Sequence, residues 1–447
     1  MKVLVIGGGG REHAIVWALG KSKRVTEVVC APGNAGIAES ARCVPVNVGD
    51  MAAMVAVVEA ERPALTVVGP ELPLSVGLVD ELIRRGFRVF GPKQAAARLE
   101  TSKSFAKEFM QRYGIPTAAH AVCTTLDEVR AELPRFSVPV VVKADGLAAG
   151  KGVVICQTHH QAEQAAAEMF SGVLLGVEET EVVLEEFLDG EEVSFFALCD
   201  GKHAVALAAA QDHKRVGEGD TGPNTGGMGA YTGDGLLSPE MEQWLLKNVA
   251  QRVVDEMAME GTPFHGILFC GMMMVPRTDG TTQPMVLEFN TRFGDPETQA
   301  ILVRLETDIL ELFEASIDGT ADKLAIKMRP GASVCVIAAS GGYPGKYASG
   351  LAIAGLESVG DPDVVVFHSG TAMKDGAVVT AGGRVLGVTA VSRATSLSTG
   401  TASGPASKGG SPLWDALGKA YGALANISFE GMQFRGDIGW RALRDGL

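Results

Sequence analysis

The first hundred residues alternate short apolar runs with helical stretches, and this alternation restricts the fold more than any other feature of the chain. The runs are rich in β-branched residues and end in loops that contain glycine or proline; they lie at 3–6, 28–30, 65–68 and 88–90. Strands that alternate with helices form a parallel sheet covered by helices. The loops after such strands gather at one edge of the sheet, where ligands bind. We therefore predict an α/β unit with a binding edge.

The rest of the chain has a different organisation. From about residue 138 it is rich in strand-like runs, interrupted by a helical stretch at 159–170 and a long amphipathic helix at about 239–260. The last 120 residues again mix strands with glycine turns. The segment 394–412 is rich in Ser, Gly and Thr and lacks periodicity, which is typical of a flexible surface insertion. A chain of 447 residues is also long enough for several domains.

Charge and cysteine content exclude several classes of protein. The formal net charge is −14, from 39 basic and 53 acidic residues. Proteins that bind nucleic acid or membrane surfaces present a basic face, so we expect neither partner. No apolar stretch approaches the ~20 residues that cross a bilayer. Seven cysteines are scattered without a CxxC pair, which predicts free thiols in a reducing compartment and hence a cytoplasmic protein.

The glycine loop at residues 7–10 precedes a helical stretch. A dinucleotide fingerprint reads G-x-G-x-x-G, but its third glycine position here is Glu12, so NAD is disfavoured. A glycine loop that leads into a helix still presents N–H groups that suit phosphate or carboxylate, and Arg11 adds a positive charge. A plain tight turn explains the same residues equally well.

The stretch VVKADGLAAGKGVV, residues 141–154, places Lys143 and Lys151 around a loop of glycine and alanine. It is not a Walker A loop, because Asp145 and Gly152 occupy positions that this motif reserves for glycine and for serine or threonine. A loop with few side chains between two antiparallel strands can fold over phosphates as a flap. Lys143 follows a run of valines, and a buried lysine requires an anionic partner. The alternative is two solvated lysines near a hairpin.

Two further stretches suggest nucleotide and metal binding. LEEFLDGEEVSFF, residues 184–196, combines a strand end, apolar residues and acids, as a purine pocket requires, although an acidic surface hairpin looks the same. In VLEFNTRFGDPETQ, Glu288 and Asn290 share one face of a predicted strand. Two neighbouring oxygen ligands suit Mg²⁺, and Arg292 continues this face if the strand persists. A polar edge strand is the alternative.

The segment QDHKRVGEGDTGPNTGGMGAY, residues 211–231, is long, charged and rich in glycine. Asp212, Lys214 and Asn224 are suited to close around a small zwitterion and a phosphate. A disordered surface loop is the alternative, but Met228 and Tyr231 among the glycines argue against it.

Read in order, these stretches resemble the ATP-grasp superfamily and, within it, the phosphoribosylamine–glycine ligases. The resemblance extends from the first residue to the last ten through GGGGREHA, APGNAG, VVGPELPL, RVFGP, SKSFAKEFM, GIPTA, GGYPG, GGRVLGVTA and DIGWRA, besides the four stretches above. It implies a multidomain α/β and α+β protein: a Rossmann-like N-terminal domain (1–103), an ATP-grasp domain (104–328) with a lid inserted at about 124–192, and a C-terminal mixed α/β domain (329–447).

The resemblance also implies which residues form the site. Those expected to bind ATP are Lys103, Lys143, Gly146, Gly150, Lys151, Gly152, Glu185, Glu186, Phe187, Leu188 and Glu192. Those expected to bind the other substrates are Gly9, Gly10, Arg11, Gly33, Asn34, Asp212, Lys214, Asn224, Gly226, Arg292, Gly294 and Asp295. Asp212, Lys214 and Arg292 are expected to act in catalysis, and Glu288 and Asn290 to bind Mg²⁺ or Mn²⁺. The preceding strand, GILFCGMMMV, lacks the further metal-binding acid that many ATP-grasp enzymes carry, so the number of metal ions stays open.

The implied reaction joins glycine to 5-phosphoribosylamine with ATP as cosubstrate, through a glycyl phosphate intermediate in a monomeric enzyme. Two alternatives stay open. One is another ATP-grasp carboxylate–amine ligase, which a substrate screen would identify. The other is a binding or regulatory protein with an inactive ATP site, which glycine-dependent release of ADP would exclude.

Overall fold

The first five strands form the parallel sheet that the sequence predicts, with the order β3-β2-β1-β4-β5. The computed structural model describes residues 1–147, 152–173, 180–393 and 410–445. The strands are β1 (Lys2–Gly7), β2 (Glu27–Pro32), β3 (Arg42–Cys43), β4 (Leu65–Val68) and β5 (Val89–Phe90). The helices among them are α1 (Gly10–Leu19), α2 (Met51–Glu61), α3 (Glu71–Ser75), α4 (Leu78–Arg84) and α5 (Gln94–Thr101).

The central strand β1 shows why this sheet is buried on both faces. Its apolar run is continuous, and side chains alternate between the two faces of a strand. Val3 and Val5 belong to one apolar core, which they share with Ile15 of α1. Leu4 and Ile6 belong to a second core on the other side, built with α2 and α4. The loops after β1 and β2 therefore leave the sheet at a fixed edge.

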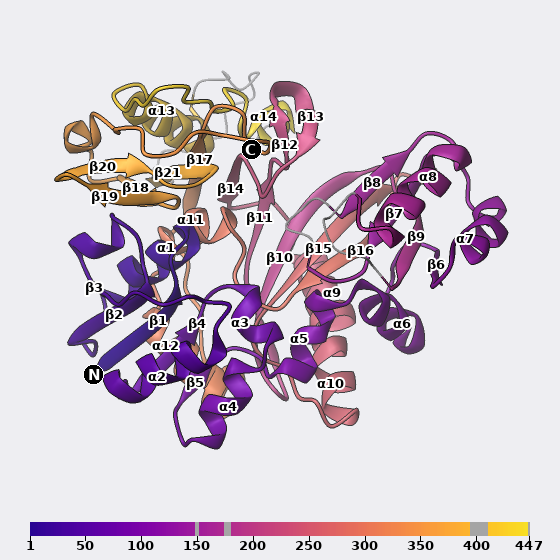
Figure 1. Ribbon diagram of the computed structural model, residues 1–447, viewed down its shortest axis with the longest axis horizontal. Helices are drawn as coiled ribbons and strands as arrows, with labels where there is room; N and C mark the ends of the chain where they lie inside the picture. The colour runs from indigo at the N-terminus through magenta and orange to yellow at the C-terminus, as the bar shows by residue number, and fades with distance from the viewer. Residues whose placement is uncertain (148–151, 174–179, 394–409, 446–447) are drawn as a thin grey trace, which may run out of the picture.

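A second, smaller unit comprises residues 120–186 and has its own apolar core. We call it the four-stranded unit. Its antiparallel sheet has the order β6-β9-β7-β8, and Figure 1 shows it away from the parallel sheet. Its elements are β6 (His120–Cys123), α7 (Leu126–Glu132), β7 (Val140–Ala144), β8 (Val153–Cys156), α8 (His159–Phe170) and β9 (Val182–Glu186). The helix predicted at 159–170 is confirmed as α8. The predicted limits of the lid stay a prediction.

The largest sheet has eight strands in the order β16-β15-β10-β11-β14-β17-β21-β18, all paired antiparallel. Its strands are β10 (Glu191–Asp200), β11 (Ala204–Asp212), β14 (Gly229–Gly233), β15 (His265–Pro276), β16 (Thr282–Asn290), β17 (Gly331–Ala339), β18 (Val364–His368) and β21 (Arg384–Arg393). The sheet continues across residue 328, because β14 pairs with β17. The predicted domain boundary at this residue stays a prediction.

Helices cover both faces of this sheet. Phe195 and Ala197 of β10 share a core with α6 (Lys103–Tyr113) and α10 (Gln251–Met259). Their neighbours Phe196 and Leu198 face α12 (Ile309–Asp318) and the parallel sheet. The long helix predicted at 239–260 comprises α9 (Pro239–Leu245), one π-helical turn (Leu246–Ala250) and α10. α11 (Glu297–Leu302) follows β16.

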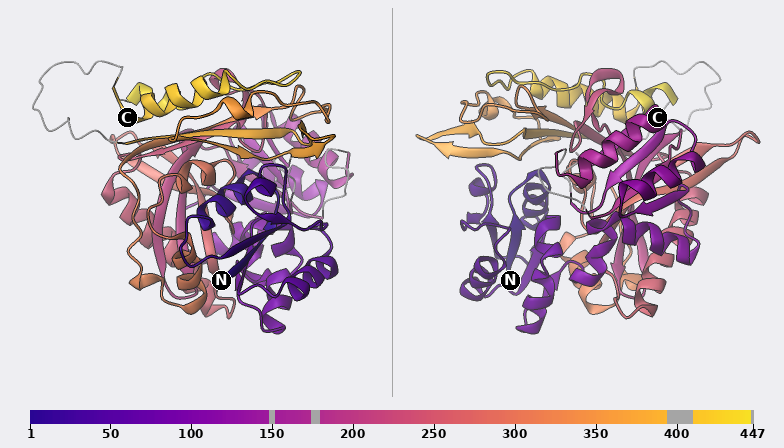
Figure 2. Two further views of the ribbon diagram at one scale, coloured as in Figure 1. Left: turned by 90° about the vertical axis from the view of Figure 1, so that its left-hand side faces the viewer. Right: turned by 45° about the vertical axis from the view of Figure 1, so that its right-hand side comes forward.

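The C-terminal part packs α13 (Pro412–Leu424) on β17 and β21 and ends in α14 (Trp440–Asp445). Two short hairpins project from the molecule, β12 (Arg215–Gly217) with β13 (Thr221–Asn224) and β19 (Thr371–Lys374) with β20 (Ala377–Thr380). Figures 1 and 2 place α14 beside the β12–β13 hairpin.

Short helical turns connect several of these elements. They are η1 (Ile37–Glu39), η2 (Leu133–Arg135), η3 (Glu218–Asp220), η5 (Ala321–Lys323) and η6 (Leu356–Ser358). Of the predicted insertion 394–412, residues 394–409 lie outside the described residues. None of the described helices is long and apolar enough to cross a membrane.

Candidate active site

A buried cluster of two lysines and one glutamate lies where the four-stranded unit meets α6. Lys143 Nζ is 2.8 Å from one carboxylate oxygen of Glu185, and Lys107 Nζ is 2.7 Å from the other. We call these three residues the cationic cluster. Lys143 therefore has the anionic partner that its burial requires, and this partner is another predicted ATP residue. Lys107 was not predicted, although it lies one helical turn after Lys103.

All three residues are buried, so each charge is neutralised mainly by the others. Burial raises the pKa of Glu185, but Lys143 and Lys107 outweigh this effect and leave it below its ordinary value. Burial lowers the pKa of Lys107 to about 8, although Glu185 opposes the change. Lys107 Nζ also donates to Thr117 Oγ1 at 2.7 Å. With one carboxylate between two ammonium groups, the cationic cluster carries an excess positive charge at neutral pH.

The residues around the predicted phosphate loop lie at the start of α6. Lys103 Nζ donates to the carbonyl oxygen of Gly146 at 2.7 Å, and the backbone N–H of Ser104 donates to Asp145 at 2.9 Å. Gly146 has a φ of +84°, which favours glycine. Gly152 accepts a hydrogen bond from the backbone of Ala144. Gly150 and Lys151 lie outside the described residues.

The predicted purine-binding residues follow β9. The backbone N–H of Glu186 donates to Ala119, and its side chain is exposed. Phe187 and Leu188 are half-buried beyond the strand end. Glu192 is the second residue of β10 and points toward Lys214, with Lys214 Nζ 3.2 Å from its carboxylate. Glu185 and Glu192 thus pair with different lysines.

The predicted metal-binding residues alternate along β16, as the sequence indicates. Glu288 lies opposite Gly271 of β15, where the absence of a side chain leaves room for Cγ of Glu288. Its oxygen Oε1 is 3.8 Å from Lys214 Nζ. Asn290 Oδ1 accepts from Arg292 at 3.2 Å. Two oxygen ligands on one strand, each facing a cation of the protein, are a donor set that suits Mg²⁺ or Mn²⁺.

The strand ends at Asn290, so Arg292 does not continue its face as a strand residue. Its guanidinium instead lies 2.7 Å from Glu100 of α5 and 3.4 Å from Glu71 of α3. Arg292 and Arg11 outweigh the effect of burial and lower the pKa of Glu71 to about 2. Neither glutamate was predicted, because each lies about 200 residues away in the chain.

A second cluster surrounds Lys214 and is rich in acids. Besides Glu192 and Glu288, it includes Asp212 and Glu297, and we call these five residues the anionic cluster. Burial raises the pKa of Asp212 to about 8; Lys214 opposes this shift, and Glu297 adds to it. Burial also raises the pKa of Glu297, whose carboxylate accepts from Ser194 Oγ at 3.2 Å. Glu297 was not predicted, although it follows the predicted residue Asp295 by two positions.

The two clusters are neighbours. Lys143 Nζ lies 3.3 Å from the carbonyl oxygen of Leu287, the residue before Glu288. Thr117, which binds Lys107, donates to the carbonyl oxygen of Val286 at 2.7 Å. The strand that carries Glu288 and Asn290 therefore joins the cationic cluster to the anionic cluster.

The predicted substrate loops meet at the edge of the parallel sheet. The side-chain amide of Asn34 donates to Gly8 at 2.9 Å and to His368 at 2.7 Å. Gly8 approaches Gly33 so closely that a Cβ would lie 2.5 Å from the Gly33 oxygen. Gly9 donates its N–H to Glu12, and Gly10 begins α1. These contacts explain the need for small residues in both loops.

Arg11 and Asp295 connect these loops to the largest sheet. The backbone N–H of Arg11 donates to Asp295 at 3.3 Å, and its guanidinium contacts Glu12 at 2.5 Å and the carbonyl oxygen of Phe293. Arg384 donates to the carbonyl oxygens of Asp295 and Gly226. Gly294 packs against Glu297, and Asn224 lies opposite Arg215 in the β12–β13 hairpin. Arg384 was not predicted.

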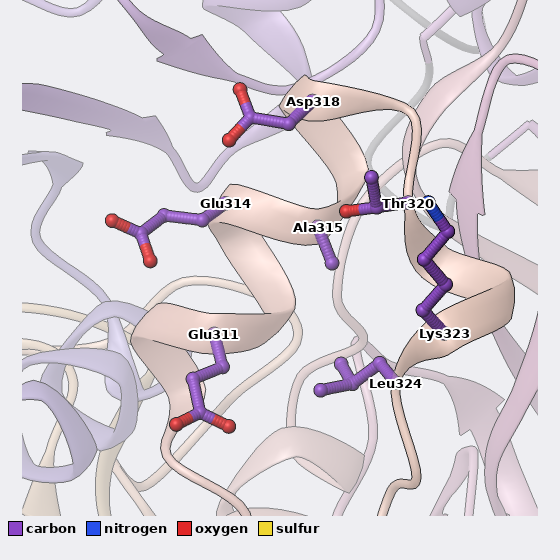
Figure 3. Close-up of a pocket in the computed structure, with 7 residues that line it drawn as sticks. All are labelled: Glu311, Glu314, Ala315, Asp318, Thr320, Lys323 and Leu324. Carbon is purple, nitrogen blue, oxygen red and sulfur yellow. The ribbon is translucent and has the colours of Figure 1, made fainter.

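A surface depression of about 310 Å³ lies elsewhere, between α12 and η5. Figure 3 shows the side chains of Glu311, Glu314 and Asp318 along one side of α12, with Lys323 on the opposite wall. Glu314 pairs with Arg24, and Asp318 pairs with Arg88. None of the predicted site residues lines this depression, and Glu314 and Asp318 connect α12 to residues next to the strands of the parallel sheet.

Comparison with known proteins covers almost the whole chain. Family models described as the N domain, the ATP-grasp (A) domain and the C domain of phosphoribosylglycinamide synthetase match residues 1–100, 101–298 and 333–441. A phosphoribosylamine–glycine ligase of Xanthomonas campestris pv. campestris is 47% identical over 446 residues, which cover 99% of this chain and 98% of the relative. One of Brucella melitensis biotype 1 is 45% identical over 444 residues, with 99% and 98% covered.

A comparison with solved structures finds the same kind of protein. A crystal structure of phosphoribosylamine–glycine ligase from Thermotoga maritima has a TM-score of 0.79 and 33% identity, with 98% of this chain and 100% of that chain covered. A biotin carboxylase of Campylobacter jejuni has a TM-score of 0.71 at 13% identity, with 100% of this chain and 95% of that chain covered. The second likeness shows a shared fold.

Proposed function

The chain belongs to the phosphoribosylamine–glycine ligase family and is an ATP-dependent ligase of purine biosynthesis, and we propose that it joins glycine to 5-phosphoribosylamine to give glycinamide ribonucleotide, ADP and phosphate. The observation that carries this proposal is the pair of adjacent clusters of opposite charge. The cationic cluster suits a triphosphate, and the anionic cluster suits a divalent metal ion and the ammonium group of an amino acid.

In the first step of the proposed reaction, a carboxylate oxygen of glycine attacks the γ-phosphorus of ATP, and the bond to the β-phosphate oxygen breaks. Lys103, Lys143 and Lys151 would neutralise the phosphates. Phosphoryl transfer requires mainly such positioning and charge neutralisation. Glu288 and Asn290 would hold Mg²⁺ or Mn²⁺, which when bound neutralises charge on phosphate oxygens. Asp212 and Glu297 would accept hydrogen bonds from the glycine ammonium group, and Lys214 would bind its carboxylate.

In the second step, the amine of 5-phosphoribosylamine attacks the acyl carbon of glycyl phosphate. The amine loses a proton, the acyl–oxygen bond breaks, and phosphate leaves. The loops around Gly8 and Gly33, with Asn34 and Asp295, would hold the ribose phosphate next to Arg292. A glycyl phosphate exposed to water would hydrolyse, so we infer that the four-stranded unit closes over it.

We also propose that the enzyme acts as a monomer in the cytoplasm. All seven cysteines are free thiols, which suits a reducing compartment.

An assay of ADP formation in which each substrate is omitted in turn tests the proposed reaction. We expect full turnover only when ATP, glycine and 5-phosphoribosylamine are all present. Without the amine, added hydroxylamine should trap the acyl phosphate as glycine hydroxamate. The Glu311→Gln variant, altered in the depression of Figure 3, is the matched control and should retain wild-type turnover.

ADP formation that is independent of glycine would contradict the proposal. If turnover instead required a different carboxylic acid or amine, the chain would be another ATP-grasp ligase. No ADP under any of these conditions would favour a binding protein.

A further inference from the structure

The C-terminal segment 435–441 is bound to the segment 212–224, which carries Asp212 and Lys214. We call residues 435–441 the C-terminal clamp. Figures 1 and 2 place α14 beside the β12–β13 hairpin. The backbone N–H of Gly436 donates to Glu218 at 2.9 Å, and that of Gly219 donates to Asp437 at 2.8 Å. The reaction proposed above assigns no role to this segment, although it contains part of the DIGWRA stretch.

Asp220 is the centre of this contact. Arg435 donates to one of its carboxylate oxygens at 2.8 Å, and Arg441 donates to the other at 2.5 Å. Arg435 is fully buried, so its charge depends on its acidic partners. Asp220 itself has a φ of +57°, a left-handed conformation that few residues other than glycine adopt. The two arginines therefore hold a residue whose backbone conformation is unfavourable by itself.

The contact reaches the anionic cluster through His213. This residue lies between Asp212 and Lys214 in the sequence, and its side chain is fully buried. Its ring atom Nε2 accepts a hydrogen bond from the backbone N–H of Gly439 at 2.9 Å. Successive side chains of an extended chain point to opposite sides. His213 thus faces the C-terminal clamp, while Lys214 points the other way, toward Glu192 and Glu288.

The backbone on both sides of His213 is held as well. Arg441 lies 3.4 Å from the carbonyl oxygen of Asp212. Thr225 donates its N–H to the carbonyl oxygen of Lys214 at 2.7 Å, and Met228 donates to that of His213 at 2.8 Å. The C-terminal clamp therefore holds this backbone at Asp212 and the ring of His213, while Thr225 and Met228 hold it at Lys214 and His213.

We propose that Asp220, His213, Arg435 and Arg441 are positioning residues that place Asp212 and Lys214 for binding of the amino-acid substrate. The choice of glycine as that substrate rests on the proposed function. The C-terminal clamp then acts in substrate binding through the segment 212–224, without contact with the substrate itself.

The Asp220→Asn variant tests this inference. Asparagine keeps the shape of the side chain and also tolerates the left-handed conformation, but it removes the charge that Arg435 and Arg441 share. We expect the KM for glycine to rise about tenfold, which corresponds to about 1.4 kcal/mol, while the KM for ATP changes less than about twofold.

The matched control is Asp363→Asn, which breaks the ion pair with Lys419 in the same part of the molecule. Asp363 and Asp220 have similar side-chain exposure, 31% and 26%, but Asp363 does not contact the segment 212–224 in the described residues. It should leave both KM values unchanged. A lower melting temperature for Asp220→Asn with an unchanged KM for glycine would overturn the inference, as would equal increases in both KM values.

If Asp220→Asn does not fold, Arg441→Lys should raise the KM for glycine about threefold, and no change would overturn the inference.

Hydrogen exchange provides a readout that is independent of the substrate. The backbone amides of Thr225 and Met228 should exchange faster in Asp220→Asn than in Asp363→Asn. Equal exchange would overturn the role of the C-terminal clamp. If wild-type enzyme does not use glycine but these amides respond, the proposed function fails and the positioning role stands.

Discussion

The cationic and anionic clusters use the same residue types in opposite proportions. In the cationic cluster two lysines, Lys107 and Lys143, share the single carboxylate of Glu185. In the anionic cluster the single ammonium group of Lys214 lies among four acids, two of which it contacts within 4 Å. The difference teaches that each cluster is incomplete by itself. One lacks negative charge and the other lacks positive charge. In the proposed reaction, the phosphates of ATP supply the first, and a divalent metal ion with the ammonium group of glycine supplies the second.

This difference also explains how the protein tolerates charged groups that are buried or half-buried. An unpaired buried charge is costly, so each ionic group takes the partner available in the protein. Lys143 pairs with Glu185, and Glu288 faces Lys214. We infer that substrates exchange these partners: phosphates replace Glu185 next to Lys143, and a metal ion replaces Lys214 next to Glu288.

The largest effect is expected from Glu288→Gln. The amide keeps the volume but removes the negative charge that the anionic cluster offers to the metal ion. We expect turnover to fall by about 10³-fold, about 4 kcal/mol of transition-state stabilisation. The rate of ADP formation against Mg²⁺ concentration, with circular dichroism to confirm the fold, measures this effect. Asp279→Asn in the exposed turn between β15 and β16 is the control, and near-normal turnover of Glu288→Gln would remove Glu288 from the metal site.

Lys143→Met should have the next largest effect, this time in the cationic cluster. Methionine retains the apolar stem of the buried side chain but cannot neutralise phosphate. We expect the Kd for ATP, measured by calorimetry, to rise about 100-fold, or about 2.7 kcal/mol. An unchanged nucleotide affinity would show that Lys143 only neutralises Glu185 and does not bind the phosphates.

Lys107→Met distinguishes the two lysines of the cationic cluster. If Lys143 turns to the phosphates as we infer, Lys107 alone neutralises Glu185. Without Lys107, Glu185 should hold Lys143 more firmly. We expect a smaller rise in the Kd for ATP, about tenfold. A loss as large as that of Lys143→Met would instead indicate direct contact between Lys107 and the nucleotide.

The pH dependence of stability tests the anionic cluster in the substrate-free protein. Because burial raises the pKa of Asp212 to about 8, the folded protein binds more protons than the unfolded chain between about pH 4 and pH 8. The contribution of Asp212 to stability is therefore present at low pH and is lost as pH rises through 8. The slope approaches about 1.4 kcal/mol per pH unit. Asp212→Asn should gain stability relative to wild type over this range in thermal unfolding, and a constant difference would contradict the buried, protonated carboxyl.

Local patterns predicted the parts of the fold that depend on nearby residues. The parallel sheet follows from the strand and helix alternation of the first hundred residues, and α8 follows from helical periodicity. The eight-stranded sheet did not follow, because no local pattern specifies that β11 lies next to β14 and β14 next to β17. Which strands become neighbours depends on the packing of the whole chain.

The site shows the same division. Lys143, Glu185, Glu288 and Asn290 were recognisable within their own stretches, but the pairing of Lys143 with Glu185 required the register of β7 and β9. Glu71 and Glu100, which hold Arg292, come from helices that the tertiary fold brings to β16. Ion-pair partners from distant segments depend on the packing of the whole chain, which local sequence patterns do not predict.

A crystal structure with a non-hydrolysable ATP analogue and Mn²⁺ tests the central claim most directly, because anomalous scattering identifies the metal. We predict that a metal peak lies within about 2.3 Å of oxygens of Glu288 and Asn290, and that Lys143 Nζ leaves Glu185 for a phosphate oxygen. A triphosphate bound away from both clusters, or a metal ion that contacts neither Glu288 nor Asn290, would contradict the account.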